Sequence, residues 1–141
     1  MRIRECVAPG EMIDTPESAV AYWLANIPLA EWYDESKEAV VVLILNTRRR
    51  IIGHNLVTLG SLDTCLIHAR EVFRPAIVAA GSAIVLMHNH PSGDATPSEA
   101  DIKATRDLIR AGQLLKMELL DHVIVGQNAF SSLRTLGYFY A

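Results

Sequence analysis

The chain has 141 residues, 50% of them hydrophobic, and a formal net charge of −3. A chain of this length fits one domain that can bury a substantial core. The acidic balance counts against a dedicated nucleic-acid binder, and no apolar run reaches the roughly 18 residues that a membrane-spanning helix needs.

Apolar periodicity and turn residues predict helices that alternate with strands, which indicates an α/β layered domain. The predicted elements, in chain order, are an irregular lead-in over 1–14, a helix over 15–27, strands over 38–46 and 51–60, a helix over 64–74 that Asp63 or Thr64 can cap, a strand over 83–89, a helix over 97–111, a strand over 119–126, and a closing strand and turn. We expect one domain over 15–141 after the lead-in.

The helix predicted over 97–111 has the clearest boundaries in the chain. Thr96 and Glu99 form a capping-box pattern, in which each side chain bonds the backbone of the other residue. Pro97, between them, suits the first position of a helix. Gly112 is the expected C-terminal stop, because glycine readily adopts the left-handed conformation that ends a helix.

Two histidines stand at the end of a predicted buried strand. Residues two apart on a strand face the same side, so His88 and His90 would both point from its carboxyl end, where α/β sheets place ligands. Asp101 would follow in the second turn of the next helix. Two imidazoles and one carboxylate suit zinc and leave a fourth position for water. The alternatives are a histidine pair bonded to water and a carboxylate that only stabilises the helix N-terminus.

A hydrolytic metal site also needs a general base and gains from a donor to the developing oxyanion. Glu38 is the candidate base, because it opens a strand that is otherwise wholly apolar. A solvated strand end is the alternative interpretation, and Glu35 and Glu99 are rival bases. Ser98 lies beside the candidate ligands and could supply the oxyanion donor, although serine is also common in the first turn of helices.

Together these residues resemble a known signature. Glu38, then His88-Asn89-His90-Pro91, then Ser98-x-x-Asp101, with ten residues between His90 and Asp101, resembles the JAMM (MPN-plus) metalloprotease motif. The wider context HNHPSGDATPSEAD, with LDHVIVG downstream and HAREVFRPAI upstream, resembles the RadC family specifically. The resemblance covers roughly residues 15–137.

The resemblance implies a cytidine-deaminase-like (JAB/MPN) fold, which is a three-layer α/β domain with a central mixed sheet flanked by helices. It implies one zinc ion per chain on His88, His90 and Asp101, with Glu38 as the general base and Ser98 as the oxyanion stabiliser. Relatives with known chemistry hydrolyse peptide or isopeptide bonds. We therefore expect a zinc metalloprotease that acts on a peptide or protein substrate.

The RadC family is linked to DNA repair by name, but we do not expect this chain to bind nucleic acid directly. Longer RadC proteins carry a helix-hairpin-helix region, and only about 35 residues precede Glu38, so the chain resembles a short stand-alone form. The alternative function is a non-catalytic binding module in a DNA-repair or mobile-element complex. A cytidine deaminase is disfavoured, because the sequence lacks His-x-Glu and Pro-Cys-x-x-Cys.

A few other residues carry weaker signals. His122 could contact a metal ligand, but the sequence favours a local hydrogen bond within its strand. Arg48–Arg50 favour an exposed hairpin turn over an anion site, and the apolar tail over 136–140 leaves a homodimer open. Cys6 and Cys65 form no Cys-x-x-Cys, and the N-terminus shows no signal peptide, so we expect a cytoplasmic protein without membrane contact.

Overall fold

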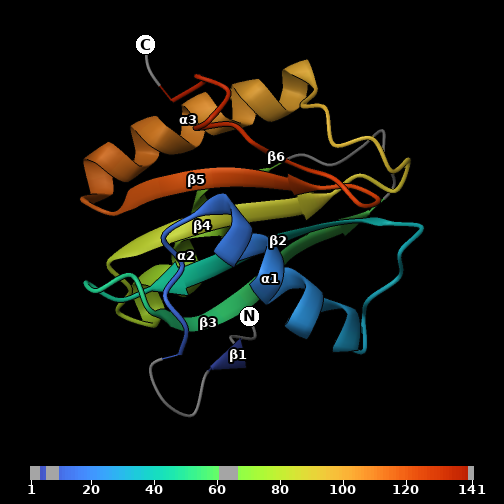
Figure 1. The fold of residues 1–141 in the computed structure, drawn as a ribbon. Helices are drawn as coiled ribbons and strands as arrows, with labels where there is room; N and C mark the ends of the chain where they lie inside the picture. Colours follow the sequence, from blue (N-terminus) through green and yellow to red (C-terminus); the bar gives the residue numbers. More distant parts are fainter. Residues whose placement is uncertain (1–3, 6–9, 61–66, 140–141) are drawn as a thin grey trace.

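A computed structural model describes residues 4–5, 10–60 and 67–139 (Figure 1). Its centre is a six-stranded sheet in the order β1-β3-β2-β4-β5-β6. Only β4 and β5 are parallel, and all other neighbouring strands are antiparallel. The strands are β1 (Arg4–Glu5), β2 (Glu38–Leu45), β3 (Ile51–Gly60), β4 (Ala83–Asn89), β5 (Glu118–Val125) and β6 (Phe130–Ser132). No helix within the described ranges has both the length and the apolar content to span a membrane.

Helices cover both faces of this sheet. Helix α1 (Pro16–Asn26), continued by the 3-10 turn η1 (Ile27–Leu29), packs on the face that is in front in Figure 1. Helices α2 (Ala69–Val78) and α3 (Glu99–Leu115) pack on the opposite face. β2 is buried along its whole length, and its alternate side chains enter the two cores. The predicted three-layer α/β architecture with a central mixed sheet is confirmed.

Part of the segment expected to be irregular belongs to the sheet. Arg4–Glu5 form β1 and pair with β3 at His54 and Gly53, and Met12 forms an isolated bridge with Arg50. These pairs cover backbone groups at the outer edge of β3. A strand of two residues is too short to leave a periodic pattern in the sequence. The division at residue 15 stays a prediction.

The second helix differs from the prediction at both ends. α2 begins at Ala69, after the N-cap residue His68, and it continues through Pro75 to Val78. The predicted caps and both cysteines lie outside the described residues.

The turn between β2 and β3 does match its prediction, because the three arginines there are exposed.

α3 is capped by Ser98 and not by Thr96. The Ser98 Oγ accepts a hydrogen bond from the Asp101 N–H at 3.1 Å, and the Asp101 Oδ2 accepts one from the Ser98 N–H at 2.9 Å. Thr96 donates instead to Asp94 Oδ1, through its N–H at 3.0 Å and its hydroxyl at 2.7 Å. The sequence contains two capping-box patterns two residues apart, one beginning at Thr96 and one at Ser98. Asp94 accepts the hydrogen bonds of Thr96, and Ser98 therefore caps the helix. Asp101 therefore lies in the first turn of α3, and Glu99 is exposed and outside the box.

Gly112 lies inside α3 and does not end it. The helix continues to Leu115, and Lys116 ends it in the left-handed conformation with φ 57°. A Cβ at Gly112 would lie 2.5 Å from the Met117 carbonyl oxygen and 3.4 Å from the Phe73 ring. The glycine is required here because the turn that follows α3 folds back at Met117 and approaches the helix backbone closely.

We expect Gly112→Ala to lower the free energy of unfolding by about 1–3 kcal/mol, the range typical of overpacking. The overlap with a backbone oxygen outweighs the roughly 1 kcal/mol by which alanine is the better helix former. Gly60→Ala is the matched control, because nothing lies within 4 Å of the added Cβ, and it should stay within about 0.5 kcal/mol of wild type. Urea unfolding measures both variants, and equal stability of Gly112→Ala would contradict the close approach.

Candidate metal centre

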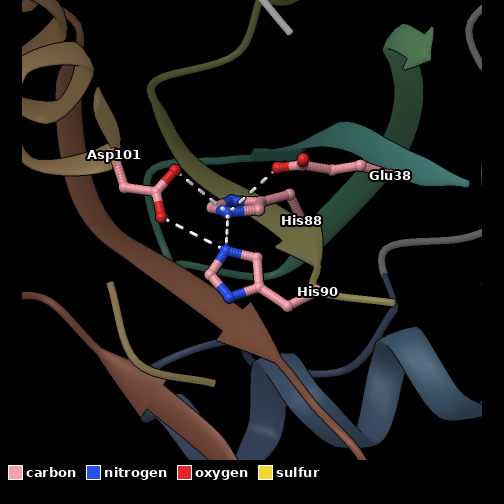
Figure 2. A group of neighbouring side chains, drawn as sticks. All are labelled: Glu38, His88, His90 and Asp101. Atoms are coloured by element: carbon pink, nitrogen blue, oxygen red, sulfur yellow. Dashed lines mark hydrogen bonds and ion pairs between the residues drawn. The ribbon is translucent and has the colours of Figure 1, made fainter. Parts of the chain in front are cut away.

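The carboxyl end of β4 brings the candidate ligands to one point (Figure 2). His88 is near the end of β4, His90 follows it, and Asp101 comes from the first turn of α3. Glu38 opens the neighbouring strand β2, where Val40 pairs with His88. Glu38 therefore lies on the same face of the sheet as His88. One ligand atom from each of the four residues lies within 4.8 Å of all the others.

The distances within this group fit a single metal ion. His88 Nε2 lies 2.9 Å from His90 Nε2 and 3.3 Å from Asp101 Oδ1. His90 Nε2 lies 3.2 Å from Asp101 Oδ2. Ligands about 2.0–2.1 Å from a tetrahedral zinc ion are about 3.3 Å apart, so all three separations are close to what one ion requires. Glu38 Oε1 lies at the side of the group, 3.4 Å from His88 Nε2.

The group is almost closed to solvent, which shapes its electrostatics. His88 is fully buried, and Glu38 and Asp101 are each 7% exposed. Burial raises the pKa of Glu38. Burial by itself would also raise the pKa of Asp101, but the His88 and His90 rings beside it outweigh burial and hold that pKa well below its usual range. The hydrogen-bond contact with Asp101 raises the pKa of His90 against the effect of burial.

A backbone carbonyl decides which nitrogen of His90 faces the site. The His90 Nδ1 lies 2.9 Å from the Asp94 carbonyl oxygen. A carbonyl only accepts, so Nδ1 carries the hydrogen and donates. The neutral ring therefore keeps its lone pair on Nε2, which points at His88 and Asp101. This lone pair and the two carboxylates attract a cation to the middle of the group.

Asn89 holds the start of β2 in place around Glu38. Its side-chain oxygen accepts a hydrogen bond from the Ala39 N–H at 2.8 Å, and its side-chain nitrogen donates to the Lys37 carbonyl at 3.0 Å. These backbone groups flank Glu38 on either side. The Asn89 side chain thus extends the β2–β4 ladder beyond its last backbone pair. The bridging role of Asn89 was not predicted, although its amide stands between two candidate ligands at the end of an apolar strand.

The sequence favours a local strand hydrogen bond for His122, but the structure places this residue against His88. The His122 Nε2 lies 2.8 Å from the His88 Nδ1, and the His122 Nδ1 lies 2.7 Å from the Thr105 hydroxyl. His122 is fully buried, and burial, reinforced by the nearby His88, lowers its pKa well below the usual range. The parallel pairing of β4 with β5 brings the two rings together.

The remaining sequence candidates are all exposed. Ser98 is exposed at the rim of the group of four, and the cap uses the oxygen of its hydroxyl as an acceptor but not its hydrogen. A role for Ser98 as an oxyanion donor stays a prediction. The rival bases Glu35 and Glu99 are both exposed and lie outside the group of four.

Comparisons with known proteins give the chain a family context. A family model described as RadC-like JAB domain matches residues 13–138. A UPF0758 protein of Chlorobaculum parvum is 45% identical over 133 residues, which are 94% of this chain and 58% of the relative. One of Chlorobaculum tepidum is 52% identical over 101 residues, 72% of this chain and 46% of the relative. One of Bacillus cereus is 39% identical over 126 residues, 89% of this chain and 54% of the relative. The chain spans about half the length of these relatives.

The ligand set predicts the effect of removing one charge. We expect Asp101→Asn to weaken zinc binding by more than the roughly 10–100-fold that follows loss of an outer partner of a ligand. Asparagine keeps an oxygen that can accept from the Ser98 N–H, so the helix start is retained. Asp107→Asn, at an exposed position on the same helix, is the matched control and should bind zinc as the wild type does. Competition with a chelator measures both affinities, and unchanged binding by Asp101→Asn would place the third ligand elsewhere.

Proposed function

Because the chain belongs to the RadC-like JAB domain family, we propose that it is a zinc-dependent hydrolase that cleaves a peptide or isopeptide bond. The family assignment made from the sequence is confirmed by this match. The proposal rests chiefly on one observation, the convergence of two imidazoles and one carboxylate beside a second buried carboxylate. A peptide or protein substrate is part of the proposal.

His88, His90 and Asp101 are the proposed zinc ligands. Their nitrogen and oxygen donors suit zinc, and three protein ligands leave one position for a water molecule or a substrate carbonyl. When bound, zinc would polarise that carbonyl and lower the pKa of a coordinated water toward roughly 7. Iron and manganese accept similar ligands, so elemental analysis of the purified chain is the direct measure of the native metal.

Glu38 is the proposed general base. Asp101 contacts both imidazole rings, whereas Glu38 contacts His88 from the side of the group. A carboxylate at that position can take a proton from a water molecule as its oxygen bonds to the carbonyl carbon. The carboxyl group can then deliver the proton to the amine nitrogen as the carbon–nitrogen bond breaks. The Asn89 bridge holds the backbone on both sides of Glu38 and so limits the motion of this carboxylate.

Ser98 is the proposed donor to the developing oxyanion. Its oxygen accepts from the Asp101 N–H, which leaves the hydroxyl hydrogen free to point away from the helix. A hydroxyl at the rim beside a ligand can stabilise negative charge on a carbonyl oxygen that enters from solvent. The same side chain thus ends the helix and presents a donor to the site.

If Glu38 is the general base, a variant without its carboxylate should keep metal binding and lose turnover. We expect Glu38→Gln to keep the zinc affinity of the wild type and to lose hydrolysis by about 10²–10⁴-fold, the usual contribution of a positioned acid–base group. Zinc-loaded chain is incubated with a mixed peptide library and with lysine-branched isopeptides, and mass spectrometry detects the products. Chelator competition gives the zinc affinity of each variant.

Glu35→Gln is the matched control, because Glu35 is an exposed carboxylate three residues earlier. It should leave both zinc binding and hydrolysis unchanged. Loss of zinc by Glu38→Gln would make Glu38 a fourth ligand and would contradict its role as base. A wild-type chain that binds zinc but cleaves neither substrate class would favour the alternative, a non-catalytic binding module.

A further inference from the structure

A continuous line of polar contacts connects the backbone of α3 to the ring of His88. The Thr105 hydroxyl donates to the Asp101 carbonyl at 2.8 Å. The same hydroxyl oxygen lies 2.7 Å from His122 Nδ1, and His122 Nε2 lies 2.8 Å from His88 Nδ1. Thr105, His122 and His88 are all 0% exposed. Water therefore has no access to these groups, and each must satisfy its hydrogen bonds within the line.

The acceptor at one end sets the direction of every hydrogen bond in this line. The Asp101 carbonyl can only accept, so it takes the single hydrogen of the Thr105 hydroxyl. The contact between Thr105 and His122 then needs a hydrogen on His122 Nδ1. A buried imidazole is favoured in its neutral form, which has one hydrogen, so His122 Nε2 is an acceptor. The contact with His88 therefore needs a hydrogen on His88 Nδ1.

We propose that Thr105 and His122 are positioning residues that fix the hydrogen of His88 on Nδ1 and so keep its Nε2 lone pair free for a metal ion. A neutral imidazole binds metal through an unprotonated nitrogen, and its other nitrogen is commonly held by an outer partner. This positioning role extends the proposed function and rests on it for the identity of the ion as zinc. The position of the hydrogen on His88, by contrast, can be measured in the metal-free chain.

The reversed arrangement shows why this line matters for the site. If Thr105 donated to His122, then His122 would donate to His88, and the His88 hydrogen would move to Nε2. That hydrogen would be shared with the His90 Nε2 lone pair 2.9 Å away, so His88 would have to lose it before its Nε2 could bind a metal ion. The reversal would also leave two oxygens, of Thr105 and Asp101, 2.8 Å apart without a hydrogen between them. This second consequence is unfavourable, so the direction in which Thr105 donates to Asp101 is preferred.

Asp101 acts at both ends of this arrangement. Its carboxylate contacts the two candidate ligand rings, and its backbone carbonyl begins the line that ends on His88. The first turn of α3 therefore sets the position of one ligand and the hydrogen of another. His90 needs no such line, because a backbone carbonyl contacts its Nδ1 directly.

The test is the position of the hydrogen on His88, read from the ring nitrogen chemical shifts in ¹⁵N NMR of the metal-free chain. The wild type should carry it on Nδ1. Thr105→Val keeps the shape of the side chain and removes the hydroxyl, so the hydrogen should move toward Nε2 and zinc affinity should fall about 10–100-fold. Thr105→Ser restores a hydroxyl and should restore both readouts.

Two further variants separate this role from a general loss of stability. Leu108→Val lies one turn later on the same helix, at a buried apolar position, and should lower stability but leave the His88 hydrogen on Nδ1. Thr105→Ala removes the same hydroxyl with a smaller side chain and should repeat the shift seen in Thr105→Val, so one of the two suffices if the other does not fold.

A wild-type His88 with its hydrogen on Nε2 would overturn the proposal, as would Thr105→Val with both the wild-type hydrogen position and the wild-type zinc affinity. The outcome is independent of activity. A wild-type chain that shows the Nδ1 hydrogen, and loses it in Thr105→Val, but binds no zinc would support the positioning role and contradict the proposed function instead.

Discussion

The reciprocal hydrogen bonds between Ser98 and Asp101 decide where α3 begins, and the geometry of the candidate metal centre depends on that start. They place Asp101 in the first turn of the helix, where its carboxylate reaches the rings at the end of β4. The side of the helix that Asp101 faces is set by the buried face of α3, because Asp101 shares that face with Thr105 and Leu108 at helical spacing. The cap adds the hydrogen bond from the Ser98 N–H to the Asp101 Oδ2, the oxygen that lies 3.2 Å from His90 Nε2. The buried face and the cap together therefore hold the carboxylate against the two rings.

The buried charges explain why the surrounding groups are so closely bonded. A carboxylate and imidazoles at the boundary of the core are costly unless each is paired or hydrogen-bonded. Every side-chain nitrogen and oxygen that is buried among the described residues has a hydrogen-bond partner. Asn89 bonds the backbone on both sides of Glu38, and Asp94 orients His90. These outer groups hold the inner four in an arrangement that mutual repulsion of the two carboxylates would otherwise open.

Much of the architecture could be predicted from the sequence, because the strands carry local signals. The predicted strands over 51–60 and 83–89 have the observed bounds, since both are apolar runs that end at turn residues. The start of α3 was predicted wrongly, because two capping boxes overlap and a local competitor, the bonding of Thr96 to Asp94 two residues earlier, selects the second one. The predicted stop at Gly112 was wrong for another local reason. A glycine near a helix end usually marks the stop itself, but here the turn that follows the helix folds back at Met117 and leaves no room for a side chain at Gly112.

The four candidate site residues could be proposed together because each lies at or near the end of a predicted element, and because their spacing resembles a known motif. His122 could not be placed with them, because strand periodicity gives the face of a side chain and not the register with the next strand. The observed register pairs Leu86 with His122 and so brings its ring beside His88.

The depth of each residue in the site determines the side from which a substrate can approach. His88 is closed off by the sheet and α3, and Glu38 and Asp101 are almost as deeply buried. His90 is half-buried and Ser98 is exposed, and both belong to the segment that connects β4 to α3. Under the proposed function, a substrate carbonyl would reach the group over this segment, where the Ser98 oxygen accepts from the Asp101 N–H and its hydroxyl hydrogen would be the proposed donor. The hydrogen bond that begins α3 would then also orient this donor, while the fully buried Thr105 and His122 hold His88 from within the core.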